Sequence, residues 1–370
     1  MVMSSMNPNN WKGKSLAEVD TPSLLLDGEA LRANIARIAA FFANRPSGLR
    51  PHFKSHKCTR ISQLQMQAGA VGITCAKLGE AEVLADAGIR EILIANQIVG
   101  RVKIARLVEL AKRAAPMVAV DSETNIRMLS EAATTAKVEI RVLVEVNIGL
   151  NRCGVQAGTP ALALVRLIAS LPGIKFEGLQ GYEGHLVDLR DEAERAEKTR
   201  AALGPLVETR RLIESAGIPV NIVTGGGTGT YTFTGDFPGV DEVQAGSYAA
   251  MDWYYFDIRP EFRQAMSILA TVISRPTPEL AIIDVGRKGV GAEFGPPRVK
   301  DFPGASVARF GSEEHTSISL PKDCKLGVGD HLELIPSHGC TTSNLYREFV
   351  VHRDGVVEDV WPIEGSGRMR

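Results

Sequence analysis

The sequence predicts an α/β fold in which a closed (β/α)8 barrel, TIM-like in type, precedes a separate β domain. Eight apolar, β-rich runs recur at residues 49–53, 71–75, 91–95, 117–120, 142–146, 176–180, 221–224 and 242–244. Helical patterns lie between them, for example at residues 79–87, 102–113, 161–170 and 192–216. Strands that alternate with helices indicate a parallel sheet, and eight such units in about 200 residues favour a closed barrel over an open doubly wound sheet.

The segments on either side of the barrel pattern differ from it. A short strand is expected at residues 23–26 and a helix at residues 28–44, where apolar side chains follow a helical period. After about residue 258, strands are expected without a long helix between them, at residues 266–274, 280–284, 331–336, 347–353 and 356–361. We therefore expect a barrel over residues 28–258 and a β domain over residues 259–370, which the N-terminal strand within residues 1–27 joins.

The composition indicates a globular protein whose partner is a small molecule. The chain has 370 residues, 44% of them hydrophobic, and its 42 basic and 43 acidic residues leave a formal net charge of −1. No long run of one charge indicates a nucleic-acid or membrane surface. The start, residues 1–14, is polar and lacks a signal-peptide pattern, and the five cysteines form no CxxC pair. We expect a cytoplasmic protein with reduced cysteines.

A lysine follows the first barrel run, at the edge where α/β folds carry their chemistry. Lys54 stands between His52 and His56, at alternating positions, and a helical segment begins at about Thr59. Such a lysine is either an ordinary solvated cation or a nucleophile that forms a Schiff base.

Two glycine-rich loops follow the seventh and eighth barrel runs, where barrel enzymes often hold phosphate. The first spans residues 224–230 (TGGGTGT) and the second spans residues 244–248 (QAGSY). Glycines let backbone N–H groups approach a phosphate, and hydroxyl groups add donors without charge. The first loop lacks the lysine of a P-loop and does not open a βαβ unit, so the nucleotide-binding motifs do not fit. The alternative is that both are plain turns.

Three further sites have two interpretations each. Arg152, in a turn after the fifth run, is either a surface charge or a donor to an oxyanion. Tyr182, after the sixth run, either packs or stacks on a planar ring. His338 and Cys340 are two residues apart, hence on one face of an extended segment, and either pack or bind a divalent ion whose other ligands are water and substrate.

Taken together, these motifs resemble one family. Residues 50–57 (RPHFKSHK), 151–155 (NRCGV), 224–229 (TGGGTG), 244–248 (QAGSY) and 336–340 (PSHGC) are similar to the D-threonine aldolase and D-serine dehydratase-like family. Its members are pyridoxal phosphate (PLP) enzymes of the alanine racemase fold, also called PLP fold type III. The resemblance extends from about Asp20 to Ile363, and its motifs are specific in combination.

The resemblance implies a role for each matching residue. Lys54 would bind the cofactor covalently, Arg152 would donate to its phenolic oxygen, and Tyr182 would lie beside its ring. The phosphate would be surrounded by Thr224, Gly226, Gly227, Gly246, Ser247 and Tyr248. His338 and Cys340 would bind the divalent metal, with Mn2+ the first expectation and Zn2+, Co2+ or Mg2+ as alternatives. His52, His56, His185 and metal-bound water are the candidates for the general base.

The resemblance also implies the assembly and the reaction. We expect a homodimer in which the β domain of one chain closes the barrel mouth of the other. Some aldolases of the family carry Asp where Cys340 stands, and the dehydratases carry Cys, but residues 244–252 and 274–276 look more like the aldolases. The expected activity is therefore retro-aldol cleavage of D-threonine and other β-hydroxy-D-amino acids to glycine and an aldehyde.

Three alternatives stay open. The first is a D-serine or D-3-hydroxyaspartate dehydratase, which forms a keto acid and ammonia. The second is a non-catalytic PLP carrier, and the third is a metal-dependent aldolase without an organic cofactor. The roughly 110 residues beyond the barrel disfavour the carrier, because such a carrier would be a bare barrel.

Overall fold

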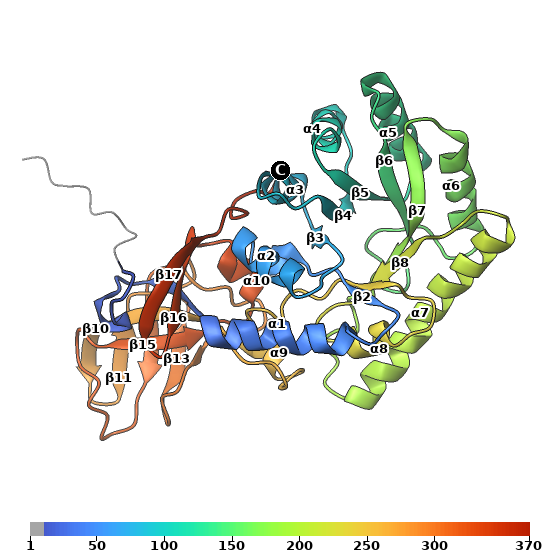
Figure 1. Ribbon diagram of the computed structural model, residues 1–370. Helices are drawn as coiled ribbons and strands as arrows, with labels where there is room; N and C mark the ends of the chain where they lie inside the picture. Colours follow the sequence, from blue (N-terminus) through green and yellow to red (C-terminus); the bar gives the residue numbers. More distant parts are fainter. Residues whose placement is uncertain (1–10) are drawn as a thin grey trace, which may run out of the picture. The chain divides into compact units, whose positions relative to one another are not determined.

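The computed structural model describes residues 11–370, which form two compact units (Figure 1). One, here called the β unit, comprises the chain up to Ile35, Ser55–Cys58 and Ser247–Gly367. The other, the barrel unit, comprises Ala36–Lys54, Thr59–Gly246 and Arg368–Arg370. The domain limits predicted from the sequence, residues 28–258 and 259–370, stay a prediction. Of the polar start at residues 1–14, the first ten residues lie outside the described part.

The barrel unit is built on eight parallel strands. In chain order they are β2 (Gly48–Leu49), β3 (Ile73–Cys75), β4 (Glu91–Gln97), β5 (Ala115–Val120), β6 (Ile140–Glu145), β7 (Ile174–Gly181), β8 (Ile222–Gly225) and β9 (Glu242–Val243). They pair in the order β2-β9-β8-β7-β6-β5-β4-β3. A parallel bridge between His52 and Thr74 joins the two ends of this order and closes the sheet. The predicted (β/α)8 barrel is confirmed, because each predicted run overlaps one strand of this sheet.

Helices connect the strands and lie outside them (Figure 1). They are α2 (Thr59–Gln67), α3 (Leu78–Asp86), α4 (Arg101–Ala111), α5 (Glu123–Ala136), α6 (Thr159–Ser170), α7 (Glu192–Ser215) and α8 (Tyr231–Gly235). Helix α5 begins after Ser122, whose hydroxyl accepts the Asn125 N–H at 3.3 Å, and α7 begins after Asp191, whose carboxylate accepts the Glu194 N–H at 2.7 Å. Such caps satisfy backbone donors that a helix start leaves without partners. None of the helices within residues 11–370 is long and apolar enough to cross a membrane.

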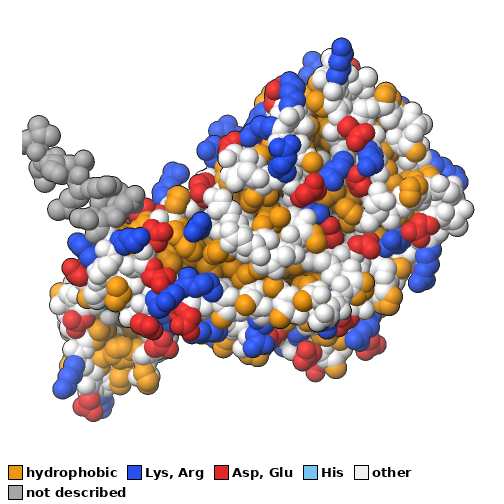
Figure 2. Space-filling view, in the orientation of Figure 1, with side chains coloured by type: hydrophobic (Ala, Val, Ile, Leu, Met, Phe, Trp, Pro, Cys, Tyr) orange, Lys and Arg blue, Asp and Glu red, His pale blue; other side chains and the backbone are white. Residues whose placement is uncertain are grey.

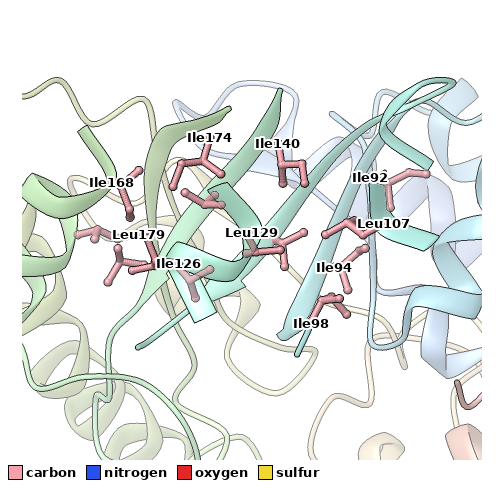
Figure 3. Packing of buried hydrophobic residues seen from close by; sticks show 14 of the residues in the cluster. Ile92, Ile94, Ile98, Leu107, Ile126, Leu129, Ile140, Ile168, Ile174 and Leu179 are labelled. Atoms are coloured by element: carbon pink, nitrogen blue, oxygen red, sulfur yellow. The ribbon is translucent and has the colours of Figure 1, made fainter. Parts of the chain in front are cut away.

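The barrel core has two layers, which follow from the alternation of side chains along a strand. Ile92 and Ile94 of β4 are fully buried and pack with helix residues such as Leu107 and Leu129 (Figure 3). Leu93 lies between them in the sequence and belongs to a separate buried cluster with two residues of neighbouring strands, Met117 and Leu143. The first layer lies between strands and helices, and the second fills the barrel interior. Each fully buried aliphatic side chain contributes about 1.5–3 kcal/mol to folding.

The β unit contains a nine-stranded sheet. Its strands are β1 (Ser23–Asp27), β10 (Met266–Thr277), β11 (Leu280–Ile283), β12 (Arg298–Val299), β13 (Ser306–Phe310), β14 (Thr316–Ser319), β15 (His331–Ile335), β16 (Glu348–Arg353) and β17 (Val356–Pro362). Strand β1 pairs antiparallel with β10 and parallel with β16. It is followed by α1 (Gly28–Phe42), which passes from this unit into the barrel unit. All five strands expected after residue 258 are present, and β12, β13 and β14 were not predicted.

One local prediction is wrong. Residues 336–340 were expected to be extended, but helix α10 (Gly339–Ser343) begins within them. Two other short helices of this unit are η1 (Leu16–Glu18), a 3-10 helix, and α9 (Trp253–Phe256). The cause is tertiary, because the Gly339 N–H donates to the buried Asp252 carboxylate at 2.8 Å. His338 is the last extended residue before the helix, and Cys340 is in its first turn.

Candidate active site

Lys54 lies directly after the first barrel strand. It belongs to a short 3-10 turn, Phe53–Ser55, that follows β2 and the bridge between His52 and Thr74. Its side chain is half-buried, and its amine has no hydrogen-bond or ion-pair partner among residues 11–370. An amine without a partner can react with an aldehyde without first breaking an internal contact.

The neighbouring Lys57 has a different environment, within the β unit. It is 7% exposed, its backbone has a positive φ of 56°, and its amine donates to the Gly365 carbonyl at 3.4 Å. His56 also belongs to this unit and is fully buried, and its Nδ1 accepts the Cys58 N–H at 3.2 Å. Lys57 and His56 therefore have contacts that stabilise this turn.

The other two candidate histidines belong to the barrel unit. His52 is 8% exposed, and its Nδ1 lies 3.4 Å from the Lys54 N–H. His185 is exposed, and its ring lies over Gly149 in the loop after β6. A Cβ at Gly149 would lie 2.8 Å from His185 Cε1, and its φ of +119° also disfavours any other residue. A side chain at position 149 would therefore displace His185, which is 36 positions away along the chain.

Arg152 and Tyr182 come together from the loops after β6 and β7. The first loop is shaped by Asn147, whose Oδ1 accepts the N–H groups of Gly149 at 3.0 Å and Asn151 at 3.1 Å. The loop presents Arg152 to solvent, with its guanidinium carbon 5.7 Å from the centre of the Tyr182 ring. Such a pair can recognise a planar, electron-rich ligand through stacking and charge.

The Tyr182 ring fits between glycines. A Cβ at Gly184 would lie 2.4 Å from the ring carbon Cε1, and a Cβ at Gly227 would lie 3.5 Å from the hydroxyl oxygen. Tyr182 therefore lies against the glycine loop that follows β8. A side chain at Gly184 would displace its ring, whereas a Cβ at Gly227 would only touch it.

The donors of that glycine loop are largely used inside the protein. The Gly226 N–H donates to Glu183 Oε2 at 3.2 Å, and the Gly227 N–H donates to Thr230 Oγ1 at 3.2 Å. Thr224 is fully buried, and its hydroxyl oxygen accepts the Gln244 amide at 3.1 Å. Gly226 and Gly227 can therefore contribute close approach and shape, because their N–H groups are already used. The Thr224 hydroxyl accepts a hydrogen bond and keeps its own proton to donate.

The loop after β9 offers such donors. The Gly246 N–H donates to no other atom of the described chain, and neither does the Ser247 N–H or hydroxyl. Tyr248, the next predicted residue, is fully buried in the β unit, with its ring centre 5.7 Å from that of Phe262.

A polar network at the carboxyl ends of the barrel strands was not predicted. The Gln97 amide donates to Glu145 Oε2 at 2.6 Å and to Asp121 Oδ2 at 3.2 Å, and Gln244 donates to Gln180 Oε1 at 3.2 Å. Burial raises the pKa of Glu145, against the opposing effects of the Gln97 hydrogen bond and the Arg152 charge. The sequence pattern that could have predicted this network is a polar residue at or just after the end of each apolar run.

His338 and Cys340 belong to the β unit and flank Gly339. His338 Nδ1 lies 3.4 Å from Glu293 Oε2, and the same carboxylate oxygen accepts the Thr341 hydroxyl at 2.9 Å. Burial raises the pKa of Asp252, which accepts the Gly339 N–H, to about 6, although two backbone hydrogen bonds and the nearby His338 lower it.

This donor set is incomplete for a metal as it stands. Within the described part of the chain, no three His, Cys, Asp or Glu side chains converge as a metal site. Imidazole and thiol nevertheless suit a divalent cation, and an open site is usual where water or substrate supplies the other ligands.

Comparisons with known proteins match this chain over nearly its whole length and agree on one family. The model of the alanine racemase N-terminal domain matches residues 26–252, and that of a serine dehydratase domain matches residues 265–352. A D-threonine aldolase of an Arthrobacter species is 40% identical, covering 99% of this chain and 98% of its own length. A 3-hydroxy-D-aspartate aldolase of Paracoccus denitrificans is 34% identical, covering 96% of this chain and 94% of its own. The crystal structure of a D-threonine aldolase from Filomicrobium marinum has a TM-score of 0.93 at 40% identity, covering 96% of this chain and 97% of that one.

Proposed function

Because the chain belongs to the family of D-threonine aldolases and D-serine dehydratase-like enzymes, we propose that it cleaves β-hydroxy-D-amino acids such as D-threonine to glycine and an aldehyde. It is a homologue of D-threonine aldolase, and the family is PLP-dependent, so the enzyme is a PLP-dependent lyase. The observation that carries the proposal is the half-buried Lys54 amine, without a partner in the described chain, directly after the first barrel strand.

The residues of the barrel unit fit the cofactor. When bound, PLP supplies an aldehyde for a covalent link to a lysine and a ring that withdraws electrons from the substrate α-carbon. In our proposal Lys54 makes that link, Arg152 donates to the phenolic oxygen, and Tyr182 packs beside the ring. Gly226 and Gly227 let the phosphate approach, with Thr224 and Gly246 around it.

A histidine is proposed to accept the proton of the substrate β-hydroxyl. As the Cα–Cβ bond breaks, the β-carbon becomes the carbon of an aldehyde. The α-carbon keeps the electron pair of the bond until it takes up a proton, which gives glycine. His52 and His185 are the stronger candidates, because the fully buried His56 already uses Nδ1 for the Cys58 N–H. A base that acts here needs an imidazole nitrogen within hydrogen-bond reach of the hydroxyl.

His338 and Cys340 are proposed to hold a divalent cation, with Mn2+ first and Zn2+, Co2+ or Mg2+ as alternatives. A cation of this kind lowers the pKa of a bound hydroxyl. The Glu293 carboxylate on the Nδ1 side of His338 supports the proposal, since metal-binding histidines commonly have a carboxylate behind the second nitrogen.

We also propose a homodimer located in the cytoplasm. The homodimer follows from the family expectation that a second chain closes the barrel mouth, and size-exclusion chromatography with light scattering tests it. The cytoplasmic location is supported by five cysteines that are all free in the structure. Basic and acidic side chains are interspersed on the face that Figure 2 shows, and we propose a small-molecule substrate as the partner, without nucleic acid or membrane.

Two measurements test the function. Incubation with D-threonine, L-threonine and D-serine, followed by product identification, should give glycine and acetaldehyde from the D-threonine alone. Comparable cleavage of L-threonine would refute the stereochemical part. In parallel, Lys54→Ala should remove the visible absorbance of the PLP-loaded protein, and Lys57→Ala should keep it. The opposite pattern would assign the cofactor to Lys57.

A second candidate is favoured by Cys340. Because the dehydratases of the family carry cysteine at this position, the same site could instead eliminate the β-hydroxyl of D-serine or D-3-hydroxyaspartate. Keto acid and ammonia as the dominant products of the same incubations would establish this alternative.

A further inference from the structure

Glu183 is a fully buried carboxylate in the turn after β7, next to Tyr182. It accepts three hydrogen bonds from the segment that follows β8. The Gly226 N–H donates to Oε2 at 3.2 Å, and the hydroxyls of Thr230 and Thr234 donate to Oε1 at 2.8 and 2.6 Å. One carboxylate therefore connects the turn after β7 to both the glycine loop and α8.

The three donors hold the loop at separate points. Gly226 is at the start of the loop, with a φ of +75°, and a Cβ there would lie 3.0 Å from Val243. Thr230 precedes α8 and also accepts the Gly227 N–H, so Glu183 acts on Gly227 through this hydroxyl. Thr234 is fully buried in α8. Without the carboxylate, both buried threonine hydroxyls and one glycine amide would lose their acceptor.

A carboxylate in this position is costly. Among residues 11–370, no Lys, Arg or His forms an ion pair with Glu183. A buried charge without a cation costs several kcal/mol unless hydrogen bonds compensate, and an apolar residue would pack there without that cost. The retained carboxylate is therefore better explained by the geometry that it imposes on the loop.

We propose that Glu183 is a positioning residue for the phosphate of the cofactor, an inference that rests on the proposed function. Its carboxylate accepts hydrogen bonds from the Gly226 N–H and from the hydroxyls of Thr230 and Thr234. These bonds fix the conformation of the glycine loop, and the phosphate would bind on the opposite side of the loop. A binding site needs its groups held to within about 0.5 Å, so a looser loop should weaken phosphate binding selectively.

The test compares two ligands on the apo form of the full-length protein. PLP carries the phosphate, and pyridoxal has the same aldehyde and ring without it. We expect Glu183→Gln, which keeps the side-chain volume, to raise the Kd for PLP at least about tenfold, a loss typical of charge-assisted hydrogen bonds. The Kd for pyridoxal should change by less than about twofold. Both are measured by absorbance titration.

A matched control is available in the strand that precedes Glu183. Glu177 of β7 is 6% exposed, and its carboxylate accepts Lys175 Nζ at 2.8 Å and Asn221 Nδ2 at 2.9 Å, toward the other end of the strand. Glu177→Gln should leave both dissociation constants unchanged, even if the melting temperature falls. Equal weakening of PLP and pyridoxal by Glu183→Gln would overturn the inference and leave a structural role only.

The outcomes separate the two proposals. If the unmodified protein binds neither ligand covalently, the proposed function fails, and the inference fails with it. If it binds PLP normally and Glu183→Gln binds it equally well, only the inference fails. Should Glu183→Gln not fold, Thr234→Val removes one donor without changing volume, and Thr234→Ser restores it. The inference then requires weaker PLP binding in the valine variant, recovery in the serine variant, and no change for pyridoxal.

Discussion

Arg50 should be the most sensitive residue of the barrel closure, and we predict that Arg50→Met destabilises the protein strongly. Arg50 follows β2, four positions before Lys54, and its guanidinium makes two 2.7 Å contacts with the carboxylate of Glu242 in β9. The side chains are 3% and 9% exposed. The pair thus connects two neighbouring strands in a place that water does not reach.

The magnitude follows from the burial of both partners. A surface ion pair is worth about 0–1 kcal/mol, but removal of one partner of a buried pair costs about 3–5 kcal/mol, because the other charge is left without compensation. At about 2–4 °C per kcal/mol for a unit of this size, Arg50→Met should lower the melting temperature by roughly 6 to 20 °C. Arg50→Met combined with Glu242→Leu removes both charges and should recover much of the loss.

Thermal unfolding followed by circular dichroism, at fixed cofactor concentration, measures both variants. A cycle of the two single variants and the double variant gives the coupling between the side chains. A fall of less than about 2 °C for Arg50→Met would refute the reasoning, since it would mean that the pair behaves like a surface pair. A double variant that loses the sum of the single losses would refute it as well.

Three further predictions concern pH, one glycine and the metal. Within residues 11–370 both ring nitrogens of the buried His352 lack hydrogen-bond partners, and burial lowers the pKa of this histidine. The unfolded chain, where the histidine pKa is about 6.5, therefore takes up the proton more readily than the folded protein. The free energy of unfolding should fall as the pH drops below that pKa. In His352→Phe the melting temperature should depend less on pH between 7.5 and 5.5, and an unchanged slope would contradict this. Gly149→Ala should reduce kcat at least about tenfold by displacing His185, on the scale of other positioning losses, whereas Gly158→Ala, with φ +79° and open space around it, should not. Equal activity of the two variants would count against a role for His185. Chelation should abolish turnover, leave the visible cofactor absorbance intact and be reversed by Mn2+, and full activity without metal would exclude the metal role.

The sequence predicts the barrel well because its signal is local. Each barrel strand is an apolar run bounded by a turn, and each long helix shows one apolar face, so burial leaves a period in the sequence. The length of a strand depends on its hydrogen bonds to neighbouring strands, which the local sequence does not show. The predicted run at residues 49–53 therefore contains only the last residue of the two-residue strand β2. Strands β12 to β14 were missed because they are short, largely half-exposed and separated by turns rich in Gly, Pro and charged residues.

The candidate site shows the same division. Lys54, Arg152 and the glycine loops were found because each motif is contiguous and follows a predicted strand. Glu183 could not be found in this way, because its donors are 43 to 51 positions away along the chain. The same holds for the start of α10, which depends on a hydrogen bond from Gly339 to Asp252 across 87 positions.

Several glycines give the most specific link between sequence and site, because each leaves room for a side chain elsewhere in the fold. Gly72 lies where a Cβ would be 2.0 Å from Arg50 Nη1, and Gly184 lies where a Cβ would be 2.4 Å from Tyr182. Gly149 does the same for His185. Each glycine neighbours a side chain that closes the barrel or lines its mouth, so a substitution there should displace that side chain while the surrounding turn persists. Alanine substitutions at these glycines should therefore impair cofactor binding or turnover more than stability. Losses of cofactor binding and turnover that only followed the loss of stability would contradict this relation.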